Sequence, residues 1–317
     1  MSLTTKVYYW IRPVLPQFLR GWIHRTVIQI RRKSSSKTWP IDPRAAQGRP
    51  PWEEWPENKR FALVLTHDVE SVDGLSKCLQ LMKMEKEMGF RSSFNFVAKK
   101  YTTPDTLRDE LISNGFEVGV HGLLHDGKLY NSKHIFRKRA KEINQCLKKW
   151  NAVGFRSPSM HHNLEWIHQL NILYDASTFD TDPFEPDHSG MRTIFPFWVP
   201  DMTGSGGYAE LPYTLPQDST LFLGLKEKDI TIWKQKLDWV VQHGGMVLVN
   251  THPDYMNFTS GKPPSMTYPS DFYRELLEYI LSEYSEEYWH PLPQEMASFT
   301  TEALGRHSCT PSRKTIP

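Results

Sequence analysis

The sequence predicts an α/β fold in which a parallel sheet or barrel is enclosed by helices. Two observations support this prediction. Short apolar runs alternate with amphipathic segments of helical spacing along most of the chain, as in repeated βα units. Reactive side chains directly follow several apolar runs, and the carboxyl ends of parallel strands meet on one rim. The expected strands are Phe61–Leu65, Ser93–Val97, Glu117–Val120, Gly154–Arg156, Tyr174–Phe179 and Met246–Asn250. The expected helices are Leu75–Met88, Thr106–Ser113, Ile135–Trp150, Leu164–Asn171, Ile230–His243 and Ser270–Tyr284.

The apolar spacing and the residues that end each segment justify these elements. Phe61–Leu65 is a continuous short apolar run, which is typical of a buried parallel strand. Leu75–Met88 has helical spacing and stops at Gly89, a residue that favours helix ends. Ile135–Trp150 is a long amphipathic helix by the same spacing. Residues 181–220 are rich in Pro, Gly and Asp, so we expect them to be irregular.

The composition of the 317 residues is that of a folded globular chain. Hydrophobic residues make up 39% and charged residues 23%, which excludes a disordered chain. No run approaches about 18 consecutive apolar residues, so we expect no membrane-spanning helix. The cysteines, Cys78, Cys146 and Cys309, are odd in number and widely spaced. They indicate neither a disulfide framework nor a CxxC metal site, and they are typical of a reducing compartment.

Residues 1–45 form a basic segment that we expect to lie outside the main fold. Residues 1–37 contain eight Lys/Arg and no Asp or Glu. We therefore expect a basic amphipathic helix, followed by a Pro/Ser-rich linker that delays the folded structure to about Lys59. Residues 14–33 would lie on an anionic membrane surface or, alternatively, pack their apolar face on the body. The apolar residues that recur at helical spacing are Leu15, Phe18, Leu19, Trp22, Ile23, Val27 and Ile30.

The rest of the chain divides into a body, residues 46–302, and a polar C-terminal tail, residues 303–317. Beyond residue 37 the chain carries 30 of its 38 basic residues and all 36 acidic ones, a net charge of −6. This sign disfavours nucleic acid as a partner. Charges interrupt every candidate apolar stretch near the N-terminus and no small-residue cleavage site follows, so we expect no signal peptide. We predict a cytoplasmic protein, peripheral on the inner face of the membrane.

Two carboxylates follow the first predicted strand. Asp68 and Glu70 are two residues apart, so in an extended segment both side chains point to the same side. One carboxylate can then bind a metal ion while its neighbour accepts a proton. The structural alternative for Asp68 is that it caps the helix that follows.

Histidines and an arginine follow three other strands. His121 and His125 have a spacing that brings two imidazoles to one metal ion if the segment makes one helical turn. Arg156 can fix the orientation of a carboxylate, or form a surface ion pair instead. His252 is a candidate general acid, or a core histidine bonded to the backbone. Carboxylates, histidines and an arginine on one rim are the composition of a metal-assisted hydrolase.

These residues, in this order, resemble the polysaccharide deacetylase family, also called the NodB-homology or carbohydrate esterase 4 group. The resemblance covers roughly residues 60–255. His121 and His125 match the HxxxH motif of the family. Arg156 matches its arginine motif, and His252 matches its late histidine. The resemblance implies a distorted (β/α)7 barrel that hydrolyses an N-acyl, or sometimes an O-acyl, group. It also implies one divalent metal ion, commonly zinc, bound by a carboxylate and two histidines.

The first motif departs from the adjacent aspartates usual in the family, because Val69 follows Asp68 and cannot bind metal. It resembles a branch of the family with an Asp-x-Asp form. That comparison implies that Asp68 is the base and that Glu70 joins the two histidines as the metal ligand. The alternative is that Asp68 itself is the ligand. A leucine that usually lies two residues before the late histidine is replaced by Asn250.

The resemblance also implies the remaining roles and the substrate class. Arg156 would hold Asp68 in place and ionised, and His252 would protonate the departing amine. The expected substrate is an N-acylated sugar, most simply N-acetylated, in a polysaccharide. The expected lack of a signal peptide, and not the resemblance, adds a lipid-linked saccharide precursor on the cytoplasmic face as a possible substrate. One alternative is a small-molecule amidase of the allantoinase-like branch, which shares the pair His252-Pro253. The other is a catalytically inactive barrel that binds glycan.

Overall fold

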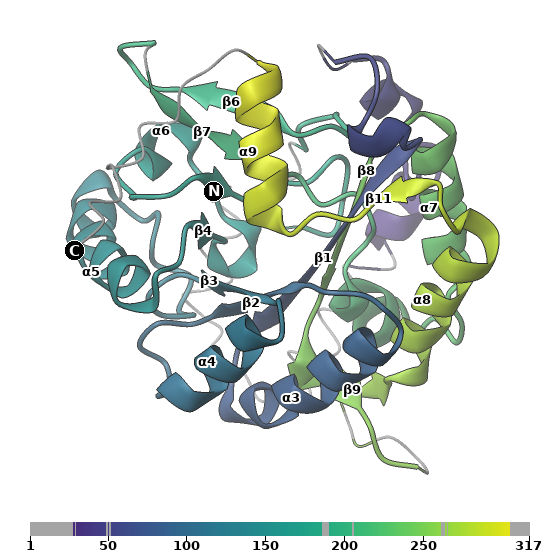
Figure 1. Cartoon of the computed structure of the whole chain (residues 1–317), viewed down its shortest axis with the longest axis horizontal. Helices are drawn as coiled ribbons and strands as arrows, with labels where there is room; N and C mark the ends of the chain where they lie inside the picture. Colours follow the sequence, from purple (N-terminus) through teal and green to yellow (C-terminus); the bar gives the residue numbers. More distant parts are fainter. Residues whose placement is uncertain are drawn as a thin grey trace.

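A curled, mainly parallel sheet with helices on its outside forms the body of the protein (Figure 1). The computed structural model describes residues 28–304, apart from 29, 49, 51, 186–189, 205, 261–263 and 265. The strands are ordered β8-β1-β2-β3-β4-β5-β7-β6, and β11 lies beside the start of β1. Only β6 and β7 pair in antiparallel fashion within this described sheet. Its strands are β1 (Phe61–Val69), β2 (Ser93–Phe96), β3 (Glu117–Val120), β4 (Gly154–Phe155), β5 (Tyr174–Asp175), β6 (Phe197–Pro200), β7 (Gly207–Glu210), β8 (Met246–Thr251) and β11 (Tyr288–Trp289).

The strand β1 is the longest strand of the described sheet and is buried along its whole length. It pairs with β8 on one side and with β2 on the other, and a strand enclosed in this way must be largely apolar. Irregular chain completes the ring between β5 and β8. There Tyr213 forms a β-bridge with Phe179. The N–H groups of Thr214 and Leu215 donate to the carbonyl of Leu248 at 3.1 and 3.3 Å. The predicted α/β fold, a distorted barrel, is therefore confirmed.

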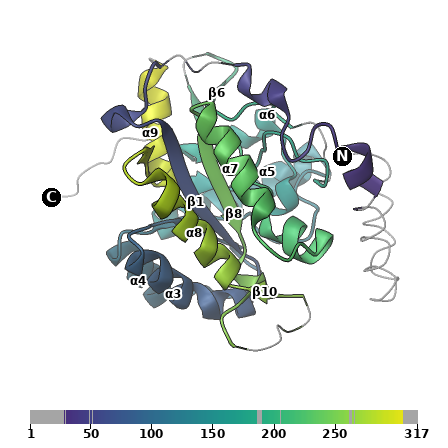
Figure 2. The same cartoon turned by 90° about the vertical axis from the view of Figure 1, so that its right-hand side faces the viewer.

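The helices lie mainly around the outside of this sheet (Figure 1). Figure 2 shows α7 and α8 side by side over β8 and β1. Ser71 caps α3 and Ser132 caps α5, each accepting a backbone N–H in the first turn. A small pair of strands, β9 (Met256–Asn257) and β10 (Tyr268–Pro269), precedes α8. The α-helices are α3 (Val72–Glu87), α4 (Asp105–Ser113), α5 (Lys133–Trp150), α6 (Leu164–Ile167), α7 (Thr231–Gln242), α8 (Asp271–Tyr284) and α9 (Pro293–Ala303). Short helical turns are η1 (Pro43–Ala46), η2 (Pro56–Asn58), η3 (Pro158–Met160), η4 (Ser219–Leu225, a π-helix) and η5 (Pro253–Tyr255).

The helix α9 marks the end of the barrel that does not carry the candidate site. The backbone N–H of Gln294, at the start of α9, donates to Glu117 Oε2 at 2.9 Å. Glu117 is the first residue of β3, so α9 lies against the amino ends of the parallel strands. The opposite rim, where the parallel strands end, is therefore the rim at which we expect the active-site loops.

Several predicted element boundaries are wrong. The strand β1 runs to Val69, beyond the predicted end at Leu65, because Thr66–Val69 pair with β2. The predicted helix Leu164–Asn171 ends at Ile167, and the N–H of Asn171 donates to a side chain, Asn144, instead of continuing the helix. The hairpin β6–β7 lies within the stretch predicted to be irregular, residues 181–220, and the π-helix η4 begins at the end of that stretch. Nothing in the predicted elements corresponded to β11 or α9.

The linker prediction also needs correction, because folded structure begins well before Lys59. Trp39, Ala45 and Trp55 are buried in the main core. The N–H of Ile194 donates to the carbonyl of Ala45 at 3.1 Å. Apolar side chains in this Pro-rich stretch are thus bound to the body, and the stretch is not a free spacer. Of the residues predicted to form the apolar face of the N-terminal helix, Leu15 to Val27 lie outside the described residues, as does the tail from residue 305.

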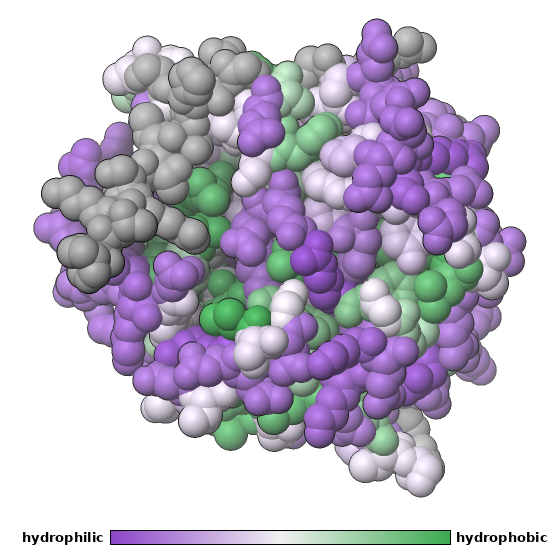
Figure 3. Space-filling model, viewed as in Figure 1, coloured by the Kyte–Doolittle hydropathy of each residue, from purple (hydrophilic) through white to green (hydrophobic). Residues whose placement is uncertain are grey.

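The face of the body drawn in Figure 3 is mostly polar. Figure 3 shows one face of the molecule, covered mainly by hydrophilic residues with smaller apolar patches between them. Among the described residues, no helix combines the length and the apolar character needed to cross a membrane.

Candidate active site

The predicted site residues come together at the carboxyl ends of the strands. Asp68 lies near the end of β1, and Glu70 follows that strand directly. His121 follows β3 and Arg156 follows β4. His252 follows β8. Parallel pairing of these strands places their ends on one rim, as the sequence predicted.

Asp68 is a buried carboxylate that three side chains hold in place. Its Oδ1 accepts from Asn95 Nδ2 at 3.0 Å and from Arg156 Nη1 at 3.2 Å. Its Oδ2 accepts from Asn250 Nδ2 at 2.9 Å. Burial alone would raise the pKa of Asp68. In the acidic range where Asp68 titrates, the protonated ring of His121, the charge of Arg156 and the Asn250 hydrogen bond outweigh burial and hold this pKa well below its usual range. Asp68 is therefore ionised and rigid, and Ser71 rather than Asp68 caps the next helix.

Arg156 is fully buried, so the alternative of a surface ion pair is wrong. Its Nε donates to the carbonyl of Ala176 at 2.7 Å. Its Nη1 lies within hydrogen-bond distance of Thr66 Oγ1 at 2.8 Å and of Asn250 Oδ1 at 2.6 Å, besides Asp68. A charged group removed from water needs such partners. Arg156 and Asn250 thus form one hydrogen-bonded unit around Asp68.

Glu70, His121 and His125 form a cluster of the kind that holds a metal ion. Their ligand atoms all lie within 4.8 Å of one another. Glu70 Oε1 is 2.9 Å from His125 Nε2 and 3.8 Å from His252 Nε2. Tyr255 donates its hydroxyl to Glu70 Oε2 at 3.0 Å. Burial would raise the pKa of Glu70, but the contact with His125 and the neighbouring histidine charges lower this pKa far below its usual range.

The two histidines do not meet through a helical turn, which corrects the prediction. Residues 121–125 form a loop in the structure. Gly122 has a φ of 65°, and a side chain there would meet Pro158 at 2.5 Å, so only glycine fits this turn. The loop nevertheless brings the rings of His121 and His125 to 5.5 Å between centroids. The two rings lie close together, as the spacing predicted, but a loop and not a helical turn brings them there.

The donor atoms fit a divalent cation. Within the described chain, Nε2 of His121 and Nε2 of His125 are buried without a hydrogen-bond partner of suitable geometry. His121 Nδ1 donates to the carbonyl of Arg156 at 3.2 Å, which fixes the tautomer that leaves the Nε2 lone pair free. Burial lowers the pKa of His121 to about 4, so its imidazole is neutral near pH 7, as a metal ligand must be. Two imidazoles and one carboxylate are a common donor set for catalytic zinc.

His252 is paired with a buried carboxylate that the sequence did not reveal. His252 Nδ1 lies 2.6 Å from Asp218 Oδ1, and the backbone N–H of His252 donates to Asp218 Oδ2 at 2.8 Å. Tyr268 donates its hydroxyl to the same Oδ2 at 2.9 Å. Burial by itself lowers the pKa of His252, but the charge and hydrogen bond of Asp218 dominate and raise this pKa to about 10. The ring is therefore protonated near pH 7 and can donate a proton from Nε2.

Four residues that support the site were given no role from the sequence: Asn95, Asp218, Asn250 and Tyr255. A weak signal existed for two of them. Asn95 interrupts the apolar strand β2, and Asn250 lies near the end of β8, where a polar side chain is uncommon unless it has a partner. Asp218 and Tyr255 lie beyond the regular strands, and their sequence neighbourhood does not distinguish them from ordinary loop residues.

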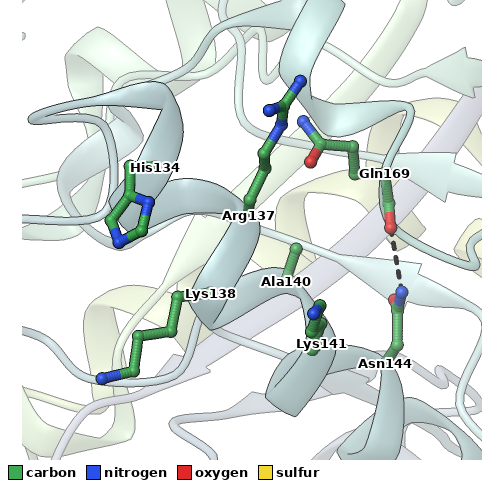
Figure 4. A pocket seen from close by; sticks show the side chains of 7 residues that line it. All are labelled: His134, Arg137, Lys138, Ala140, Lys141, Asn144 and Gln169. Carbon is green, nitrogen blue, oxygen red and sulfur yellow. Dashed lines mark hydrogen bonds between the residues drawn. The ribbon is translucent and has the colours of Figure 1, made fainter.

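A separate groove of about 540 Å³ lies along α5 (Figure 4). Its lining includes the cationic side chains Arg137, Lys138 and Lys141, with Ala140 between them. Figure 4 shows the chains of Lys138 and Arg137 pointing to different sides of the helix. None of the lining residues belongs to the cluster around Glu70, so this groove is not part of the candidate site.

Comparison with known proteins identifies the fold. No protein-family model matches the chain, and no curated protein matches its sequence significantly. A candidate polysaccharide deacetylase from Mycobacterium smegmatis superimposes with a TM-score of 0.62 at 17% identity, covering 85% of this chain and 99% of that one. Puue allantoinase gives a TM-score of 0.60 at 16% identity, with 83% and 98% covered. A probable polysaccharide deacetylase from Pseudomonas aeruginosa PAO1 gives the same values. Over most of its length, this chain has the fold of the polysaccharide deacetylases.

Proposed function

We propose that the protein is a metal-dependent hydrolase that removes an N-acyl group, most simply N-acetyl, from a sugar. The observation that carries the proposal is the arrangement of three units on one rim. A fixed, ionised Asp68 lies 3.8 Å from His121, and a protonated His252 lies 3.8 Å from Glu70. The base and the acid thus both border the triad of Glu70, His121 and His125. Amide hydrolysis needs these components: a base, an acid and an electrophile.

The triad would hold one divalent cation, and its donor set favours zinc. Such an ion would polarise the acyl carbonyl and lower the pKa of a water molecule towards about 7. Asp68 accepts the proton of the attacking water, because its carboxylate is ionised and cannot turn away from Asn95, Arg156 and Asn250. His252 donates a proton from Nε2 to the departing amine, and Asp218 keeps the ring oriented and charged. Asp68 could instead be the ligand, but its oxygens are already engaged by three donors.

The substrate we propose is a polysaccharide or a lipid-linked saccharide precursor. The resemblance of the motifs and the shared fold support a saccharide. A second candidate is a small amide, because Puue allantoinase superimposes as well as one of the polysaccharide deacetylases. A catalytically inactive glycan-binding barrel is the third possibility from the sequence. It rested on Val69, which cannot bind metal. In our proposal the carboxylate of Glu70 would be the ligand instead, since it lies with His121 and His125.

Acetate release from N-acetylated saccharides tests this function. The purified protein should release acetate from chitooligosaccharides or from N-acetylated lipid-linked sugars. A chelator should abolish the release and added zinc should restore it, because the triad provides the electrophile only with a cation bound. Hydrolysis of allantoin-like amides without saccharide turnover would favour the small-molecule alternative. A metal-loaded protein that binds glycan but releases nothing would contradict the proposal.

We also propose that the basic N-terminal segment holds the protein on the cytoplasmic face of an anionic membrane. The charge pattern of residues 14–33 supports this proposal, since each cation near such a surface contributes about 1 kcal/mol. The full-length protein should sediment with vesicles containing phosphatidylserine, and less so at high salt, because the attraction is screened within about 8 Å at physiological ionic strength.

Charge reversal distinguishes this segment from the groove on α5. Arg20→Glu with Arg25→Glu should abolish sedimentation with the vesicles. Lys138→Glu with Lys141→Glu changes the charge equally and should leave sedimentation intact. If only the second pair releases the protein from vesicles, α5 is the contact and the proposal for the N-terminal segment is wrong.

A further inference from the structure

The first residues that the structure describes bind a loop at the rim of the candidate site. We call residues 28 and 30–39 the N-terminal strap. Arg31 Nη1 lies 3.2, 3.0 and 3.4 Å from the carbonyl oxygens of Pro183, Phe184 and Glu185. The ring of Trp39 packs edge-on against Phe184, with 4.9 Å between centroids. One guanidinium nitrogen thus faces three successive carbonyls, which fixes the path of this loop.

The strap also contacts a second rim element, the π-helix η4. Ile28 is only 4% exposed, and a side chain at Gly224 in η4 would meet Ile28 Cδ1 at 2.6 Å. Arg32 Nη1 lies 2.7 Å from Glu227 Oε1, just after η4. π-Helical turns are rare and occur frequently at functional sites. Here the turn is packed against the strap through a glycine that leaves room for Ile28.

The two segments that the strap contacts, residues 183–185 and η4, carry or adjoin side chains that bond to the proposed base and acid. Asp218, the partner of His252, immediately precedes η4. On the other loop, Glu185 Oε1 accepts from Gln217 Nε2 at 2.6 Å and from Tyr213 at 2.7 Å. Gln217 Oε1 lies 3.5 Å from the Nδ2 of Asn250, the amide that holds Asp68. The strap is therefore a few hydrogen bonds away from both the proposed base and the proposed acid.

We propose that the N-terminal strap is part of the active site, and that Arg31 is a positioning residue: it holds the loop of residues 183–185, and through Glu185 it sets Gln217, the neighbour of Asp218. The proposal rests on the proposed function for its kinetic consequences. Its structural consequence is slower local opening of the rim segments that the strap contacts, and this does not depend on the substrate.

Substitution of Arg31 in the full-length protein tests the proposal. Arg31→Ala should lower kcat by about 10-fold to 100-fold, because small misplacements far from the chemistry have effects of that size. KM should change much less, and metal content should stay at the wild-type level, since the triad does not contact the strap. Arg31→Lys, which keeps a charged donor, should recover part of the loss. Lys33→Ala is the matched control, because Lys33 is exposed on the same segment, and it should keep wild-type kcat.

Hydrogen exchange separates this proposal from the proposed function. Arg31→Ala should speed amide exchange in residues 217–227, and Lys33→Ala should not, because exchange reports local opening without any substrate. If the wild type proves inactive on every acylated saccharide, the comparison of amide exchange in Arg31→Ala and Lys33→Ala still tests whether Arg31 positions residues 217–227. Arg31→Gln serves if the alanine variant is too unstable to purify. Wild-type kcat in the Arg31 variants, or unchanged exchange in residues 217–227, would overturn the positioning role.

Discussion

Replacing Asp68 with asparagine is expected to lower turnover by a factor of about 10² or more, the usual contribution of a general base, while the protein keeps its metal. Asparagine has nearly the shape of aspartate but cannot accept the proton of water. Its amide nitrogen would also face Asn250 Nδ2, a donor that in the wild type donates to a carboxylate oxygen of Asp68. That mismatch should cost about 1–3 kcal/mol of stability, which a thermal melt would record.

The control for this variant is Asp73→Asn, which makes the same chemical change at an exposed residue of α3 paired with Lys77. It should leave turnover and metal content unchanged. Metal loss in Asp68→Asn would assign Asp68 as the ligand. Turnover within a few-fold of the wild type would remove Asp68 from the role of base.

Replacing Glu70 or His121 with alanine is expected to remove bound metal and, with it, turnover. Glu70 is the anionic member of the triad, and His121 presents a neutral nitrogen whose orientation the carbonyl of Arg156 fixes. Changes in residues that merely support metal ligands cost about 10-fold to 100-fold in metal affinity, so loss of a ligand should cost more. Plasma emission spectroscopy of the purified variants measures the metal directly.

A matched control for the histidine is His134→Ala, on the exposed face of α5, which should keep the metal. The circular dichroism of all variants should match the wild type, because these ligands lie at a strand rim and not in the apolar core. Full stoichiometric metal in both Glu70→Ala and His121→Ala would refute the assignment of the triad.

The site residues that could be predicted from the sequence are those that follow a recognisable strand. A short apolar run marks a parallel strand, and the residue after it must lie on the rim, so Asp68, Glu70, His121, Arg156 and His252 were found without any contact information. The fold class followed from the same alternation. Periodicity determines which segments are strands, and parallel pairing then determines where their ends go.

The residues that support these groups could not be predicted, because their roles depend on contacts between distant segments. Asn250 meets Asp68 across β8 and β1, and Asp218 meets His252 from an irregular stretch. An asparagine or aspartate in a loop has no periodic signature. The π-helix η4 also follows a path that tertiary contacts, including those with Ile28, determine.

The Pro-rich stretch of residues 34–57, which overlaps the end of the N-terminal strap, was misread for a related reason. Proline and serine in residues 34–57 indicate a linker by composition, yet Trp39 and Trp55 bury their rings in the body. A few large aromatic side chains can hold a Pro-rich stretch on a core, because each ring buries a large apolar area. That burial outweighs the preference of the neighbouring proline and serine residues for an irregular, exposed chain.

The central claim is that Glu70, His121 and His125 hold one catalytic cation, and anomalous diffraction from crystals grown with zinc tests it most directly. The account predicts one anomalous peak at the zinc edge, about 2.0–2.2 Å from a Glu70 oxygen and from Nε2 of both histidines. Asp68 should remain bonded to Asn95, Arg156 and Asn250, outside the coordination sphere. A fully loaded crystal with zinc bound by Asp68 in place of Glu70, or with no peak between these histidines, would contradict the account.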